Sequence, residues 1–150
     1  MAHTYTNILV HVIFSTKDRQ AWLVPEIKER LFGYIGGIVR ENGGRVMMVN
    51  GPSDHVHALV AMPATVSVAD MLRVVKTNSS RWVHDEWPER GDLAWQAGYG
   101  AFSVSQSAVD DVKAYIERQE EHHKRMSFKE EFLAFLKRHG IEFDERYVWE

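Results

Sequence analysis

The sequence predicts an α+β fold, an antiparallel sheet with helices on one face and further helices at the C-terminal end. Three observations support this prediction. Four short segments are rich in β-branched and aromatic residues, apolar residues recur at helical spacing between them, and turn residues separate the two kinds of segment. A chain of 150 residues with 45% apolar side chains can bury one substantial core but is too short for two full domains.

The N-terminal half is predicted to form a strand, a helix and a β-hairpin. Side chains alternate along the first strand, one side of which carries Leu9 and His11. Pro25 suits the first turn of the helix, and Asn42 with the two glycines after it ends that helix. A Gly-Pro pair at 51–52 favours the turn of the hairpin. The predicted ranges are 4–15 for the first strand, 25–42 for the helix, and 45–50 and 54–62 for the hairpin strands.

The C-terminal half is predicted to contain three helices and one more strand. Ser67, Ser107 and Ser127 each stand three residues before an acidic residue, which is the spacing of a capping box and predicts a helix start. Pro88 and Gly140 mark the ends of the first and last of these helices. The helices are expected from 67 to before 88, from 107 to about 124 and from 127 to 140, with the strand at 99–105.

The order of the first six predicted elements is β-α-β-β-α-β, which is the order of a ferredoxin-like fold. In that topology the first and third strands are central neighbours, so a site would be built on the face of the sheet that the two intervening helices leave open. We expect one domain over 1–150, with a core at about 4–125 and a C-terminal helix and tail at about 127–150.

Composition limits the classes of site and of partner. There is no cysteine, so a metal would have to be held by imidazole, carboxylate, amide or water, and eight histidines are available. The sequence has no apolar run of membrane-spanning length and no export signal, which predicts a cytoplasmic protein without a membrane partner. The net charge of −3 predicts that contacts with nucleic acid, if made, are local.

The third strand contains the sharpest local motif, His55-Val56-His57. Strand alternation places the two imidazoles on one face, roughly 6 to 7 Å apart along the strand, while Val56 points to the other face. Two imidazoles in this arrangement can share one metal ion. Taken alone, the motif is equally explained by chance, by a surface pair or by histidines hydrogen-bonded within the core.

The helix after the fourth strand carries a second chemical motif, in which Tyr115 and Gln119 are one turn apart and project from the same side. A phenol and an amide oxygen are therefore presented together. His122 and His123 extend this side of the helix. Taken alone, ordinary packing of the tyrosine and a solvated amide explain the same spacing.

Several segments in this order resemble one known family. They are Ser15-Thr16-Lys17, Gly51-Pro52-Ser53-Asp54-His55-Val56-His57, Lys76-Thr77-Asn78-Ser79-Ser80-Arg81-Trp82, Trp95-Gln96-Ala97-Gly98-Tyr99-Gly100-Ala101-Phe102-Ser103-Val104-Ser105 and Tyr115-Ile116-Glu117-Arg118-Gln119-Glu120-Glu121-His122-His123. With these segments the chain resembles the single-tyrosine HUH transposases of the insertion-sequence-200 class, including their relatives associated with repetitive extragenic palindromes. The resemblance covers nearly the whole chain.

The resemblance implies an enzyme that cleaves and rejoins single-stranded DNA through a covalent 5′-phosphotyrosine intermediate. It implies that Tyr115 is the nucleophile and that His55, His57 and Gln119 hold a divalent metal, Mg²⁺ or Mn²⁺. It further implies a substrate with hairpin ends and a homodimer, in which the tyrosine helix of one subunit can complete the metal site of the other.

Contacts with single-stranded DNA are expected from local basic residues and from side chains on the open face of the sheet. His11 is singled out because its strand should adjoin the strand of the two histidines. The same basic residues can equally form a solvated surface, since charged clusters commonly do. The candidates are Tyr5, His11, Lys17, Arg19, Lys76 and Arg81.

Two other functions fit the same residues. A ferredoxin-like domain could bind nucleic acid without cleaving it. A small metallohydrolase could instead use His55 and His57 with an activated water, which would give a hydrolysed product and no covalent intermediate. Dependence of a covalent DNA adduct on Tyr115 separates both from the transposase.

Overall fold

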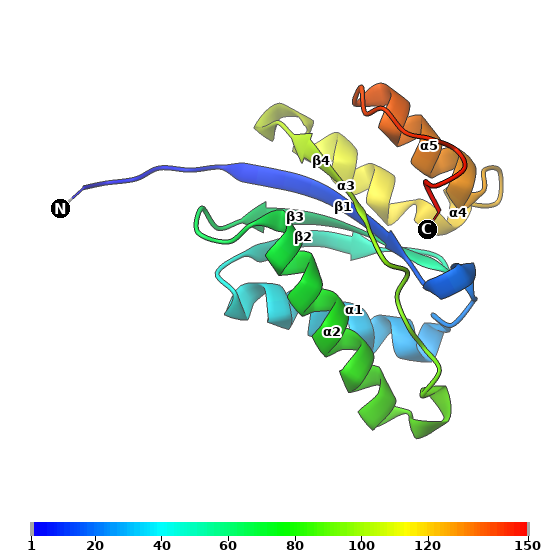
Figure 1. Cartoon of the computed structure of the whole chain (residues 1–150). Coiled ribbons are helices and arrows are strands. Elements are labelled where there is room, and N and C mark those ends of the chain that lie inside the picture. Colours follow the sequence, from blue (N-terminus) through cyan, green and yellow to red (C-terminus); the bar gives the residue numbers. More distant parts are fainter. Residues whose placement is uncertain (1, 150) are drawn as a thin grey trace.

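A computed structural model describes residues 2–149 and contains one antiparallel sheet of four strands in the order β2-β3-β1-β4 (Figure 1). β1 and β3 are the central neighbours, as the predicted topology requires. The α+β prediction is therefore confirmed. The strands are β1 (Ile8–Ser15), β2 (Arg45–Asn50), β3 (His55–Met62) and β4 (Gly100–Val104).

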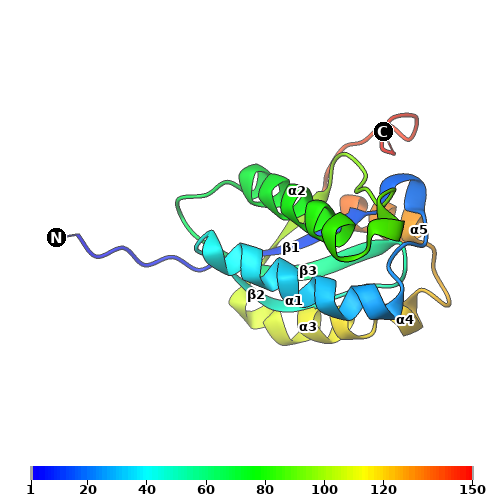
Figure 2. The same ribbon diagram turned by 90° about the horizontal axis from the view of Figure 1, so that it is seen from below.

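Helices cover both faces of the sheet. The two long helices α1 and α2 lie side by side on one face, and the C-terminal helices α3, α4 and α5 lie on the other (Figures 1 and 2). The face expected to be open is thus covered by the part of the chain that follows β4. The helices are α1 (Pro25–Glu41), α2 (Val68–Glu86), α3 (Val109–Glu117), α4 (Gln119–His122) and α5 (Phe128–Arg138), with short 3₁₀ helices η1 (Lys17–Arg19), η2 (Pro88–Arg90) and η3 (Gln106–Ala108).

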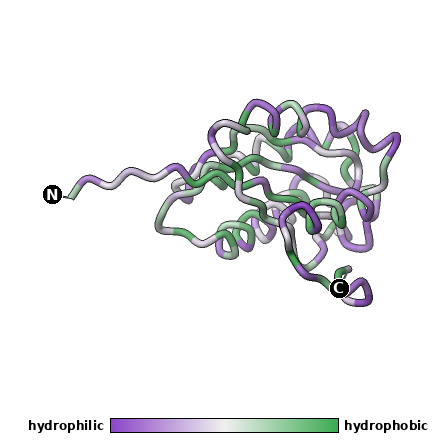
Figure 3. The backbone as a smooth tube through the Cα atoms, turned by 90° about the horizontal axis from the view of Figure 1, so that it is seen from above, coloured by the Kyte–Doolittle hydropathy of each residue, from purple (hydrophilic) through white to green (hydrophobic). Residues whose placement is uncertain are grey.

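The largest apolar core lies between the sheet and the α1/α2 layer. Alternate residues of the central strands, such as Val12 of β1 and Val56 of β3, point into it and meet Leu31 and Ile35 of α1. Figure 3 shows hydrophobic stretches running through the interior of the molecule while much of the outer surface of the helices is hydrophilic. Burial of these apolar side chains is what holds the two central strands and the first two helices together.

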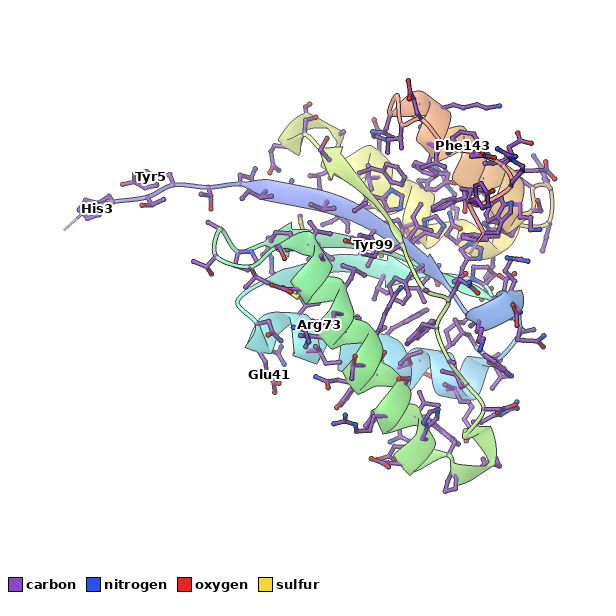
Figure 4. All side chains as sticks on the ribbon, viewed as in Figure 1. His3, Tyr5, Glu41, Arg73, Tyr99 and Phe143 are labelled. Atoms are coloured by element: carbon purple, nitrogen blue, oxygen red, sulfur yellow. The ribbon has the colours of Figure 1, made fainter. Side chains whose placement is uncertain are left out.

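Most predicted boundaries agree with the structure to within a few residues, and Ser67 and Ser127 cap their helices as expected. The first strand is shorter than predicted and begins at Ile8. Its partner β3 ends at Met62, opposite Ile8, so earlier residues have no neighbouring strand to bond with. Tyr5 consequently lies on an extended N-terminal arm, away from the sheet, with 90% of its surface exposed (Figure 4).

The helix predicted from Ser107 to Lys124 is wrong as one continuous element. A 3₁₀ turn precedes α3, and the backbone leaves the helical region at Arg118, which separates α3 from α4. Ser107 does not cap α3; its hydroxyl pairs with that of Ser105 instead. Within residues 2–149 no helix is both long and apolar enough to cross a bilayer.

Candidate active site

β3 presents His55 and His57 on the face of the sheet that α3, α4 and α5 cover, and both are fully buried. Each Nδ1 atom has its own partner: that of His55 lies 2.7 Å from Oδ1 of Asp54, and that of His57 lies 2.8 Å from Nε2 of His11 on β1. These contacts fix the ring orientations. Both Nε2 atoms therefore point toward the same small volume.

α5 delivers a carboxylate into that volume. Oε1 of Glu131 lies 2.8 Å from Nε2 of His57, 3.0 Å from Nε2 of His123 and 3.4 Å from Nε2 of His55. The four candidate ligand atoms all lie within 4.8 Å of one another. Three imidazoles and a carboxylate this close form a donor set that can hold a divalent metal ion.

Tyr115 and Gln119 reach the same carboxylate, one from α3 and the other from α4. The Tyr115 hydroxyl donates to Oε2 of Glu131 and lies 3.2 Å from Nε2 of His122. The Gln119 amide donates to Oε2 of Glu131 across 3.3 Å. Its Oε1 is buried without a hydrogen-bond partner, although an unsatisfied buried oxygen is costly.

The charge of the site is concentrated on Glu131. Burial favours its neutral form, but hydrogen bonds from His123, His55 and His57 outweigh burial and hold the pKa of Glu131 well below its usual range. Burial, followed by the contact with this carboxylate, raises the pKa of Tyr115 above its usual value. At neutral pH the site therefore holds an ionised carboxylate beside a protonated phenol.

The pKa values of the buried histidines shift in different directions because their neighbours differ. Burial lowers the pKa of His57 to about 4 and that of His11 to about 3, so both are neutral at pH 7. Neutral imidazole is the form that binds metals. Burial also opposes the charged form of His55, but hydrogen bonds with Asp54 and Glu131 outweigh it and raise the pKa of His55.

The residues nominated for DNA contact are distributed over several parts of the molecule. His11 is buried and contacts His57, so it helps to hold the ring of His57 in place. Lys17 and Arg19 lie in η1, directly after β1. Lys76 and Arg81 lie on α2, on the far side of the sheet from the histidines, where Lys76 donates to the backbone oxygens of Gln96 and Gly98.

Sequence reasoning missed Glu131 and did not assign a role to His123. A signal for Glu131 is visible in retrospect, because it stands between Phe128 and Phe135 on the side of α5 that packs on the sheet. A carboxylate at such a position must have buried partners. Nothing in the spacing of α5 indicates that these partners are the histidines of β3.

The chain matches the family model described as IS200-like transposases over residues 4–119. It is 27% identical over 114 residues to the ISDra2 transposase TnpA of Deinococcus radiodurans, with 73% of this chain and 81% of the relative covered. It is 24% identical over 132 residues to the transposase of insertion sequence IS200 from Salmonella typhimurium, with 83% and 84% covered.

Solved structures show the same likeness. A crystal structure of a Deinococcus radiodurans protein described as a transposase superposes with a TM-score of 0.64 at 25% identity, covering 79% of this chain and 96% of that one. A REP-associated tyrosine transposase bound to a REP hairpin shares the fold with a TM-score of 0.61 at 13% identity, covering 82% and 73%. Since the family match spans most of the sequence, the chain belongs to the IS200-like transposases, a family of DNA-processing enzymes.

Proposed function

We propose that this transposase cleaves and rejoins single-stranded DNA through a covalent bond between Tyr115 and the 5′ phosphate of the cut strand. One observation carries the proposal. The Tyr115 hydroxyl and the Nε2 atom of His57 contact the two oxygens of the same carboxylate, that of Glu131. A phosphate between them would be within reach of both a nucleophile and the proposed metal ligands.

We assign the divalent metal, Mg²⁺ or Mn²⁺, to His55, His57 and Gln119. The two imidazoles turn their Nε2 atoms inward, and the buried Oε1 of Gln119 lacks the partner that a cation would supply. His123 and Glu131 offer two further donors in the same volume. When bound, the ion would act as a Lewis acid that relieves charge on the phosphate oxygens.

In the proposed reaction the Tyr115 oxygen forms a bond to phosphorus, and the bond between phosphorus and the 3′ oxygen breaks. The electron pair leaves with the 3′ oxygen, which gains a proton and becomes a free hydroxyl. Nε2 of His122, at 3.2 Å, can accept the phenol proton. Attack by another 3′ hydroxyl reverses the step and rejoins strands without an external energy source.

Glu131 has to move before this reaction can begin. One of its oxygens faces the imidazoles and the other faces Tyr115 and Gln119, so its carboxylate stands where we place the scissile phosphate. Two anions cannot share that position. We therefore infer that the described arrangement is closed, and that DNA binding requires withdrawal of the Glu131 side chain or a shift of α5.

The adduct itself is the test. Metal-loaded protein is incubated with single-stranded DNA that carries a hairpin, and covalent complexes are counted on a denaturing gel. We expect an adduct that Tyr115→Phe abolishes and that Tyr34→Phe retains, because Tyr34 stacks on Trp82 in the opposite layer. An adduct that survives Tyr115→Phe would refute the assignment. Hydrolysed product without adduct would favour the metallohydrolase, and binding without cleavage would favour the binding module.

We also propose that Tyr115 acts on the metal site of its own chain, because it reaches Glu131 and Gln119 without a second subunit. The homodimer implied by the family resemblance is compatible with this. Mixing His57→Gln protein with Tyr115→Phe protein tests it. We expect no adduct from the mixture, whereas restored activity would show that one subunit supplies the tyrosine to another.

A further inference from the structure

The exposed edge of Tyr115 borders a groove at the surface of the protein. The groove has a volume of about 350 Å³ and is lined by Tyr115, Arg118, Glu121, His122 and Arg125. The histidines of β3, in contrast, are fully buried beneath α5. A DNA strand can therefore approach Tyr115 from solvent through this groove.

The groove contains two available positive charges. Arg118 and Arg125 are exposed, and neither forms an ion pair with another residue in the range 2–149, whereas Lys28 and Arg30 on α1 do. The nearby carboxylate of Glu120 is bonded to Lys28 at 2.5 Å and is thereby partly neutralised. The one carboxylate that lines the groove is that of Glu121, so the arginines outnumber it.

A third arginine lines a second hollow beside the tyrosine. Arg138 of α5 lines a smaller hollow of about 120 Å³ together with Tyr115, His122 and Glu131. Its charge acts to lower the pKa of Tyr115, although burial dominates that pKa. Arginine side chains thus line both hollows that Tyr115 borders, in a chain whose net charge is −3.

We infer that Arg118 and Arg125 bind the sugar-phosphate backbone of single-stranded DNA next to the scissile phosphate. A guanidinium group pairs with phosphate oxygens through two parallel hydrogen bonds, and such contacts position a strand without reading its sequence. The inference deepens the proposed function, since it rests on a strand reaching Tyr115. It places the DNA path on the α3–α4 side of the sheet, not along α2.

The experiment measures binding without chemistry. Fluorescence anisotropy follows a labelled 20-nucleotide oligothymidylate with EDTA present, over a series of NaCl concentrations, for the wild-type chain and for Arg118→Gln, Arg125→Gln and Glu121→Gln. Arg40→Gln is the matched control, because Arg40 is an exposed arginine near the end of α1, in the opposite layer. Thermal unfolding confirms that each variant is folded.

Each groove arginine should contribute one phosphate contact. We expect Arg118→Gln and Arg125→Gln each to reduce the slope of log affinity against log salt by about 0.7. The loss of affinity that each substitution causes should therefore be about fivefold larger at about 0.1 M salt than at about 1 M. Glu121→Gln should strengthen binding, and Arg40→Gln should leave the slope unchanged.

Equal salt slopes for the groove variants and for Arg40→Gln would overturn the inference. It would also be overturned if Arg81→Gln on α2 reduced the slope while the groove variants kept the wild-type slope. Absence of wild-type binding to the oligothymidylate would overturn it too. Because the assay needs neither metal nor adduct, these outcomes are independent of whether Tyr115 is the nucleophile.

Discussion

The two faces of the sheet are built from the same strands and differ in the polar cluster that only one of them carries beside its apolar side chains. Toward α1 and α2, β3 contributes Val56, Ala58 and Val60 to a continuous apolar core. Toward α3, α4 and α5, the same strand contributes His55 and His57 to a polar cluster that is equally buried. Apolar burial on the first face stabilises the folded protein, whereas burial of polar groups on the second face lowers that stability.

A short strand can thus combine stability with chemistry. Alternation lets each residue be chosen for its own face, so a histidine can be placed without interrupting the core behind it. The polar face remains tolerable because its nitrogens and carboxylate bond to one another. We therefore expect substitutions on the two faces to affect different measurements.

The largest effect should come from His57→Gln on the polar face. Loss of a proposed metal ligand should reduce adduct formation by more than about 100-fold, since even partners outside the ligand set typically cost 10- to 100-fold. Glutamine keeps hydrogen-bonding capacity for the neighbours of His57, so the protein should remain folded. Adduct rates with Mn²⁺ measure the effect, and near-normal rates would remove His57 from the metal site.

Leu31→Ala on the apolar face should do the reverse. Leu31 is fully buried, and its truncation should lower the free energy of unfolding by about 2 to 5 kcal/mol. Below its unfolding transition, the variant should still form the adduct at close to the wild-type rate. Urea denaturation and the adduct assay check the two halves. A large loss of activity in fully folded protein would show that the faces are coupled.

Glu131→Gln should produce a smaller change that links the two properties. The substitution removes charge-assisted hydrogen bonds worth about 1.5 to 3 kcal/mol and should destabilise the metal-free protein by about that amount. It should also make adduct formation about tenfold faster, because the neutral amide does not repel the phosphate that has to displace it. Slower adduct formation would instead identify Glu131 as a required ligand or base.

The smallest effect should come from Lys76 on α2. Burial lowers the pKa of Lys76 to about 8, so between pH 10.5 and 8 the unfolded chain binds a proton that the folded chain releases. Its contribution to stability is therefore present above pH 10.5 and is lost as the pH falls through 8. From pH 8 to 10.5 the free energy of unfolding of wild type should therefore rise relative to that of Lys76→Met. A constant difference between the two proteins would contradict the shift.

The sequence predicted what depends on local patterns. Alternation along β3 placed His55 and His57 on one face, and helical spacing placed Tyr115 and Gln119 on one side of their segment. The Ser67 and Ser127 caps followed from the acidic residue three positions later. Each of these predictions depends on residues that are close in the sequence, within one or two helical turns or a few strand positions.

What the sequence did not predict depends on tertiary packing. Glu131 enters the site only because α5 folds back over the sheet, and its partners on β3 are more than seventy residues away in the chain. No glycine or proline marks the break at Arg118 in the sequence. Ser107 has the spacing of a cap, but a 3₁₀ turn occupies that position.

Anomalous diffraction from crystals grown with Mn²⁺ would locate the bound metal ion. We expect one Mn²⁺ peak within coordination distance of Nε2 of His55, Nε2 of His57 and Oε1 of Gln119, with the Tyr115 hydroxyl facing it. A peak elsewhere would contradict this metal site if Oε1 of Gln119 still lacked a partner and both Nε2 atoms still faced only protein groups.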